Sequence, residues 1–332
     1  MNADPRQRMG ALIAALAAFA VLLGVAVAHA AFSAPVNLSA PGAYPPEIAT
    51  DADGDAVAVW RRSDGSNQRV QARTISATGA LGPIRTLSAA GQNGESYQIA
   101  TDADGDAVAV WLLFDGSDRR LQARTISATG ALGPIQNLTA TDQTVLGPRI
   151  AMNADGDGIV AWVRTFEGIP RVQTRTISAT GALGPTRNLS AAGQYGADPQ
   201  IASDADGDAV AVWETAVGLN HRIKARTISA AGALGSISNL SADGQYAAFP
   251  QIAGDAEGDA VAAWERDLPS SRIQARTISA AGVLGPKQTL SAPGQLLDGP
   301  QVAIDADGGA VVAWLGGVNG FDHLRAQYSR GP

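Results

Sequence analysis

The chain of 332 residues contains no cysteine, two lysines and few aromatic residues. The lack of cysteine excludes disulfides, a thiol nucleophile and attachment to a membrane through a lipidated cysteine. No segment after residue 30 is apolar enough to cross a membrane. The net charge of −7 makes nucleic acid an unsuitable partner. A chain of this composition must be held together by its apolar core.

The first thirty residues have the order of a secretory signal peptide. Arg6 and Arg8 precede an almost unbroken apolar run at 9–28, and Ala28-His29-Ala30 fits a cleavage site. We therefore predict a signal peptide at 1–30 and a protein that is secreted or held in the cell envelope of a bacterium. The alternative is an uncleaved anchor, because about 20 apolar residues can span a bilayer, and membrane attachment is expected only in that case.

One segment returns six times along the chain and always ends in tryptophan. The copies are spaced by 51 residues, with a single spacing of 50 at the end. A fixed period of this size indicates one supersecondary unit that is copied and stacked. The six tryptophans, which are all that the chain contains, are Trp60, Trp111, Trp162, Trp213, Trp264 and Trp314.

Each repeat predicts four short strands. In the second copy, an apolar stretch at 98–101 leads into the turn Asp102-Ala103-Asp104-Gly105, whose first Asp and Gly suit a hairpin with a bulge. Residues 107–111 then alternate in the manner of a strand, and 121–127 and 134–139 are further strand candidates. Nothing in the unit has a helical period. The repeat is expected to be an antiparallel meander.

The two ends of the chain carry complementary fragments of the unit. Residues 35–39 match the fourth strand of a repeat, whereas the last copy stops after its third strand at 324–329. A ring in which the N-terminal strand completes the last blade would leave no open sheet edge. We therefore predict an all-β fold, a six-bladed β-propeller of four-stranded antiparallel blades, as a single domain at 31–332.

The D-A-D-G-D hairpin followed by an alternating apolar strand resembles the repeats of secreted bacterial six-bladed β-propellers. Its turn is similar to that of NHL-type repeats. The resemblance covers residues 35–330 and implies the architecture alone, because such families include binding proteins, lyases and hydrolases. The Asp-box of sialidases does not match, since its aromatic residue follows the glycine by three positions and Trp60 follows Gly54 by six.

The two ends of each repeat differ in variability. The turns between strands one and two and between strands three and four are nearly constant, and we call that side the uniform end. The other two connections differ in every copy and form what we call the variable end, where binding residues are expected; free drift of the loops is the alternative. The candidate ligand-binding residues there are Tyr97, Phe114, Phe166, Tyr195, His221, Tyr246, Phe249, Phe321 and His323.

Three repeated features are interpreted as structural. The acids of the first turn, such as Asp51, Asp53 and Asp55, have the wrong spacing for a helix-loop-helix calcium site, so we expect turn chemistry and solvated surface. The tryptophans are expected to form core between blades. The third-strand arginines are expected to anchor one blade to the next, and they are Arg73, Arg124, Arg175, Arg226 and Arg276. No metal and no cofactor is expected.

Catalytic motifs are lacking in the mature chain, and no copy carries a large insertion. We therefore expect a monomeric binding or scaffold module that recognises an extracellular glycan or protein, and no catalytic residue is assigned. The alternative is a glycoside hydrolase or lyase, which would need an acid and a base at the variable end. The carboxylates that could supply them are Asp64, Asp115, Asp118, Glu167, Asp198, Asp267, Asp298 and Asp322.

Overall fold

The computed structural model describes most of the chain from residue 34 to residue 329. The signal-peptide prediction lies outside the described residues. Leu38–Pro332 form one compact unit, and residues 34–37 belong to a separate one. Inside the larger unit the segments left undescribed are 117–118, 142–143, 219, 268–270, 293–295 and 319–320. Side chains are also left undescribed at 166, 217, 296–298, 318 and 321–322.

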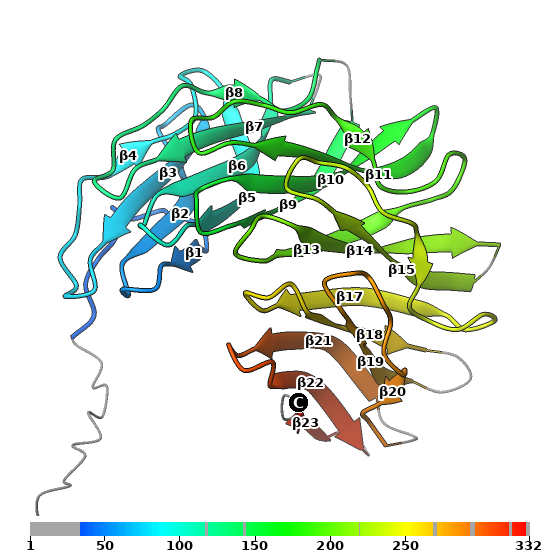
Figure 1. Cartoon of the computed structure of the whole chain (residues 1–332). Coiled ribbons are helices and arrows are strands. Elements are labelled where there is room, and N and C mark those ends of the chain that lie inside the picture. The colour runs from blue at the N-terminus through cyan, green and yellow to red at the C-terminus, as the bar shows by residue number, and fades with distance from the viewer. Residues whose placement is uncertain are drawn as a thin grey trace, which may run out of the picture. The chain divides into compact units, whose positions relative to one another are not determined.

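The unit is built from antiparallel sheets that follow one another in chain order (Figure 1). The first two sheets contain β1 (Glu47–Thr50), β2 (Ala56–Ser63), β3 (Gln68–Ile75) and β4 (Arg85–Thr86), then β5 (Asn93–Thr101), β6 (Ala107–Phe114), β7 (Arg119–Ile126) and β8 (Gln136–Asn137). The next two contain β9 (Thr144–Met152), β10 (Gly158–Phe166), β11 (Ile169–Ile177) and β12 (Arg187–Asn188), then β13 (Ala197–Ser203), β14 (Ala209–Val217), β15 (Asn220–Ile228) and β16 (Ser238–Asn239). The last two contain β17 (Ala247–Gly254), β18 (Ala260–Arg266), β19 (Arg272–Ile278) and β20 (Gln288–Thr289), then β21 (Leu296–Ile304), β22 (Ala310–Val318) and β23 (Phe321–Ser329).

This architecture confirms the predicted six-bladed propeller. The first strand of each sheet contacts the first strand of the next, so β1, β5, β9, β13, β17 and β21 form the inner layer. The short fourth strands lie on the outer side of the blades (Figure 1). Within the described residues, no helix reaches the length and apolarity that a membrane crossing needs.

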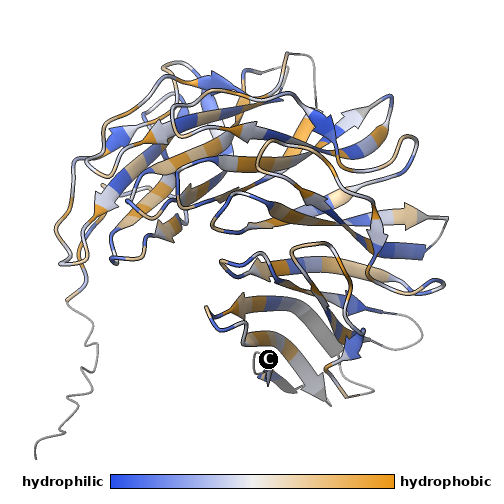
Figure 2. Cartoon of the chain, in the orientation of Figure 1, coloured by the Kyte–Doolittle hydropathy of each residue, from blue (hydrophilic) through white to orange (hydrophobic). Residues whose placement is uncertain are grey.

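The apolar core lies between neighbouring blades, as predicted from the tryptophans. Trp111 and Trp213 are fully buried, and Trp111 packs with Val57 and Val59 of the preceding blade. Strand β6 is buried along its first seven residues because blades cover both of its faces, which explains its nearly continuous apolar sequence. The apolar side chains therefore follow the second strands through the blades (Figure 2).

The third-strand arginines join each blade to the one before, which confirms the predicted anchor. Arg226 Nε donates to the Gly235 carbonyl of its own blade at 2.6 Å, and its NH1 donates to the Leu189 carbonyl of the preceding blade at 3.1 Å. The same pair of bonds recurs in the other four copies. In the first blade Arg73 NH1 donates to the Leu38 carbonyl at 3.1 Å, and Leu38 belongs to none of the described sheets.

The uniform end is organised by its acids more fully than the sequence suggested. Asp102 Oδ1 accepts bonds from the Asp104 and Asp106 amides, and Gly105 has the expected left-handed φ of 83°. The third acid, expected to be solvated surface, instead bridges two hairpins, because Asp106 Oδ1 accepts from the Ala128 amide at 2.8 Å. Equivalent bonds hold the first, third, fourth and fifth blades.

Closure of the ring by the N-terminal strand stays a prediction. Within the described residues the last sheet contains three strands, β21, β22 and β23, and residues 35–39 form no strand. Leu324 of β23 is 82% exposed, whereas Val70 and Leu121, which hold the same position in the first two blades, are fully buried. The third strand of the last blade thus lacks the cover that its counterparts have.

Candidate active site

The variable end brings three of the predicted residues together between the fourth and fifth blades. His221 is the second residue of β15, and the Tyr246 ring stacks on it with centroids 4.4 Å apart. The Tyr195 ring is also near, with its centroid 6.1 Å from that of His221 and its plane tilted by 52°. The two tyrosines occupy equivalent places in consecutive repeats, so the repeat itself brings two aromatic rings to one histidine.

A glutamate that the sequence analysis did not select completes this cluster. Glu214 follows Trp213 on β14 and forms a hydrogen bond with His221 Nδ1. The two residues face each other because β14 and β15 pair in a register that sets Glu214 opposite Ile223, diagonally across from His221. The Glu214 side chain is 8% exposed and that of His221 is 24% exposed. The pair is thus shielded yet open to solvent on the histidine side.

Burial raises the pKa of the Glu214 carboxyl above its ordinary value. The hydrogen bond and charge of His221 oppose that rise, as does a bond from the Phe249 backbone amide. The negative charge of Asp198 raises the Glu214 pKa further. Burial is the largest of these influences, so the net shift of the Glu214 pKa is upward while the carboxyl retains hydrogen-bonding partners.

Asp198 connects this cluster to the inner layer of strands. It lies on β13 and is exposed, and its charge also raises the pKa of the Tyr195 hydroxyl, which burial raises most. On β9 of the third blade, Arg149 Nε donates to Gln200 Oε1 at 3.0 Å. Burial lowers the pKa of Arg149, and the charges of Glu47 and Asp198 oppose that change.

Glu47 and Arg149 break an otherwise uniform ring. The residue at this position of the inner strand is glutamine in the other four blades, at Gln98, Gln200, Gln251 and Gln301. The ring therefore holds one acidic and one basic side chain among neutral amides. The charges of Glu47 and Asp198 act on Arg149, and those of Asp198 and His221 act on Glu214.

The other predicted residues lie apart from this cluster, with the exception of Phe249, whose amide bonds to Glu214. The Tyr97 hydroxyl donates to the Pro45 carbonyl and so ties the second blade to the first. The guanidinium of Arg119 lies 5.7 Å from the centre of the Phe114 ring. His323 is exposed on β23 opposite Gly316. Phe249 is 54% exposed beside the cluster. The side chains of Phe166 and Phe321 lie outside the described residues.

Most of the candidate carboxylates have local structural partners. Asp64 accepts bonds from the Ser66 and Asn67 amides of its own loop, and Asp115 pairs with Arg120 at 3.0 Å. Asp267 accepts a bond from the Ser271 hydroxyl. Glu167 is exposed in a two-residue turn. Asp198 acts on Glu214 itself, and the Asp267 amide donates to the Tyr246 carbonyl of the cluster at 2.8 Å. Asp118 and the side chains of Asp298 and Asp322 lie outside the described residues.

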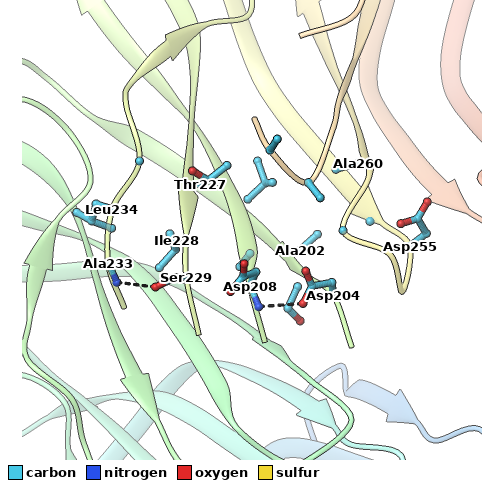
Figure 3. Close-up of a pocket in the computed structure, with 18 residues that line it drawn as sticks. Ala202, Asp204, Asp208, Thr227, Ile228, Ser229, Ala233, Leu234, Asp255 and Ala260 are labelled. Atoms are coloured by element: carbon cyan, nitrogen blue, oxygen red, sulfur yellow. Dashed lines mark hydrogen bonds between the residues drawn. The ribbon is translucent and has the colours of Figure 1, made fainter. Parts of the chain in front are cut away.

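Cavities at the uniform end belong to the blade packing. One of about 350 Å³ opens between the fourth and fifth blades, where Asp204, Asp208 and Asp255 line it (Figure 3). Its polar atoms hold the turns, since Asp204 Oδ1 accepts from the Asp208 amide and Ser229 Oγ from the Ala233 amide. Similar cavities recur between the first three blades. A feature repeated in this way is a consequence of stacking, so we place the site at the variable end.

The described side chains include no group of three or more histidine, aspartate or glutamate residues that could hold a metal ion. What the cluster offers is proton chemistry. A buried carboxyl with a raised pKa can donate a proton, a histidine tunes it, and an exposed carboxylate stands near it. Glu214 was missed because it lies inside a strand; the available signal was that the residue after tryptophan is an acid in two blades only, Glu214 and Glu265.

No protein-family model and no curated protein sequence matches the chain. Solved structures do match its fold. A Penicillium chrysogenum α-L-arabinanase bound to arabinobiose has a TM-score of 0.53 at 13% identity, over 90% of this chain and 96% of that one. A Fusarium graminearum α-L-arabinofuranosidase with arabinobiose has a TM-score of 0.51 at 13% identity, covering 89% and 95%. A Dyadobacter fermentans protein of unknown function has a TM-score of 0.53 at 12% identity, covering 86% and 94%.

These findings correct the function expected from the sequence. A binding or scaffold module was inferred from the similarity of the copies, which hid the difference between the fourth blade and the others. The fold is shared with an arabinanase and an arabinofuranosidase, and the fourth blade carries a buried acid that no other described blade pairs with histidine. These neighbours fit the alternative from the sequence better than they fit a binding module.

Proposed function

We propose that the protein is a glycoside hydrolase whose active site lies at the variable end of the fourth blade. The observation that carries the proposal is Glu214, a buried carboxyl with a raised pKa that is hydrogen-bonded to His221. Hydrolysis of a glycosidic bond requires a proton for the leaving oxygen, and a carboxyl whose pKa is raised by burial can supply it. Glu214 is therefore assigned as the general acid.

Asp198 is assigned as the second carboxylate. It is exposed on the same blade, and its charge acts on Glu214. The two carboxyls thus have contrasting environments, one buried and one solvated, which is the arrangement that separates an acid from a base or nucleophile. The charge of Asp198 also acts on the Arg149 guanidinium of the third blade.

The side chains around Glu214 and His221 indicate the substrate class. The Tyr195 and Tyr246 rings offer flat apolar faces beside polar atoms, a combination that suits sugar rings. The fold is shared with two proteins solved with arabinobiose, which supports furanosides as the first substrates to test. A kinship with NHL-type repeats rests on the D-A-D-G-D turn alone and adds nothing to this assignment.

We infer that the protein is a secreted enzyme that acts on extracellular glycans. The apolar segment at 9–28 supports export, with cleavage before Ala31 and a monomeric domain at 31–332. Mass spectrometry of the exported protein tests the cleavage directly. An N-terminus at Ala31 is the expected result, and retention of residues 1–30 in the membrane fraction would contradict it.

The test of the activity is a panel of 4-nitrophenyl glycosides and arabinan, assayed with the native chain and matched variants. Glu214→Gln keeps the size and a hydrogen-bonding group but cannot donate a proton as an acid, so turnover should fall by about 10²–10⁴-fold. Turnover by the Asp198→Asn variant should fall by a similar factor.

The matched control is Glu265→Gln, which changes the acid at the same position of the neighbouring blade. This variant should keep turnover within about twofold of the native rate, because substitutions near the surface and outside the active site have small effects. Equal losses in both variants, or no turnover of any glycoside by the native chain, would contradict the proposal.

A further inference from the structure

A strained backbone position recurs on the inner strands at the variable end. In five blades the residue that lies two places before the glutamine position of the inner strand, which is Arg149 in the third blade, has a left-handed φ between 43° and 55°. The register of each strand pair shifts at this point, so each is a β-bulge. The residues at this position, which we call the bulge ring, are Ser96, Gly147, Asp198, Phe249 and Gly299.

Glycine meets the demands of this position without strain, and the chain uses it in two blades, at Gly147 and Gly299. Ser96, Asp198 and Phe249 instead carry side chains in a conformation that a Cβ disfavours, most of all for a bulky ring. All three side chains are exposed, so their own burial does not offset the strain. Such residues concentrate at functional sites, where the surrounding structure imposes the conformation.

Phe249 shows what its bulge achieves. The left-handed turn directs the Phe249 amide toward the Glu214 carboxylate, to which it donates a hydrogen bond. The same residue leaves its phenyl ring 54% exposed, three residues after Tyr246, whose ring stacks on His221. The bulge therefore sets a backbone donor on the acid and an aromatic face toward solvent beside it.

We propose that Phe249 is the stacking platform for the sugar ring that occupies the site. The inference rests on the proposed glycosidase function. A sugar has an apolar face of C–H groups and a rim of hydroxyls, so it fits a phenyl face with hydrogen-bonding groups beside it. Asp198, on the bulge of the preceding blade, supplies a polar neighbour of that kind.

Two substitutions separate the ring from the backbone. Phe249→Gly removes the phenyl group and relieves the left-handed strain, while it keeps the amide that binds Glu214. Phe249→Ala removes the ring as well but keeps a Cβ in the strained position. We expect Phe249→Gly to unfold at a higher temperature than Phe249→Ala, which reverses the usual order of glycine and alanine within a strand.

The ligand test uses titration calorimetry with arabinobiose and a glycan array, alongside kinetics on the best glycoside of the panel. Both variants should bind sugar about tenfold more weakly, with KM raised by a similar factor and kcat within about threefold. Unchanged KM and binding in both variants, while Glu214→Gln abolishes turnover, would overturn the platform and leave the hydrolase intact. Sugar binding weakened by both variants, without turnover by the native chain, would overturn only the hydrolase. No sugar binding by the native chain would overturn the platform as well, and so would the ordinary order of the two unfolding temperatures.

Discussion

His221 stacks on Tyr246 of the next blade with ring centroids 4.4 Å apart and an angle of 24° between the planes. The contact crosses a blade boundary and holds the imidazole where its Nδ1 meets the Glu214 carboxylate. One stacking contact therefore fixes the partner of the proposed acid. It also lets the two roles of His221, stacking and hydrogen bonding, be separated by mutation.

Replacement of His221 by phenylalanine should shift the pH profile. Phenylalanine keeps an aromatic ring against Tyr246 but removes the bond and the charge that lower the Glu214 pKa. The pKa of Glu214 should therefore rise further, and the alkaline limb of kcat/KM should move to higher pH. Tyr246→Phe, which keeps both partners of Glu214, is the control and should leave that limb in place. A His221→Phe profile that matches the native one would contradict the assigned role of His221.

Glu214 should also make stability depend on pH. Its carboxyl has an ordinary pKa of 4.5, and burial raises the pKa in the folded state. The folded state therefore binds more protons than the unfolded state between the two values, and stability is lost as the pH rises through the raised pKa. Urea unfolding of the native chain and Glu214→Gln at several pH values measures this. The difference between them should favour the native chain most at low pH, and a difference that does not change with pH would contradict it.

The acids of the uniform end should differ in their effects on stability. Asp106→Ala removes the bond to the Ala128 amide and should cost about 1 kcal/mol, whereas exposed Asp104→Ala should cost less than about 0.5 kcal/mol. Gly105→Val should cost most, because φ is 83° and a Cβ would lie 2.7 Å from Asp51 Oδ2. Chemical unfolding of the three variants gives the order, and equal costs for the two acids would rule out the hairpin bridge.

Ring closure can be tested with a disulfide, because the chain has no cysteine of its own. In the second blade Gln122 pairs with Asn137. The same register in the last blade would pair Arg325 with Asn37. Asn37→Cys with Arg325→Cys should therefore oxidise to an intramolecular bond, as should the reference pair Gln122→Cys with Asn137→Cys. Asn37→Cys with Gln327→Cys is the register control. A bond in the control alone, or dimers linked between chains, would contradict closure within one chain.

The sequence predicted the fold well because the same strand and turn signals occur in every copy of the repeat. Six copies of the turn, three of which read D-A-D-G-D, and of the terminal tryptophan set the strands, and the left-handed Gly105 and the buried Trp111 follow from local chemistry. The site was predicted only in part. Tyr195, His221 and Tyr246 were selected from their place in variable connections, but Glu214 meets His221 only through the register of β14 and β15. The bulges at Asp198 and Phe249 could not be predicted from these two residues. Glycine, the usual residue at a left-handed position, stands there only in two other blades, at Gly147 and Gly299.

The central claim, that Glu214 gives its proton to the leaving oxygen, is tested most directly by the leaving group. A 2,4-dinitrophenyl glycoside departs without a proton, whereas the natural linkage requires one. Glu214→Ala should therefore lose about 10³-fold in kcat/KM on an arabinan-derived oligosaccharide and less than about tenfold on the dinitrophenyl glycoside. Equal losses on both substrates would contradict the claim, because Glu214 would then act in binding or folding and not as the acid.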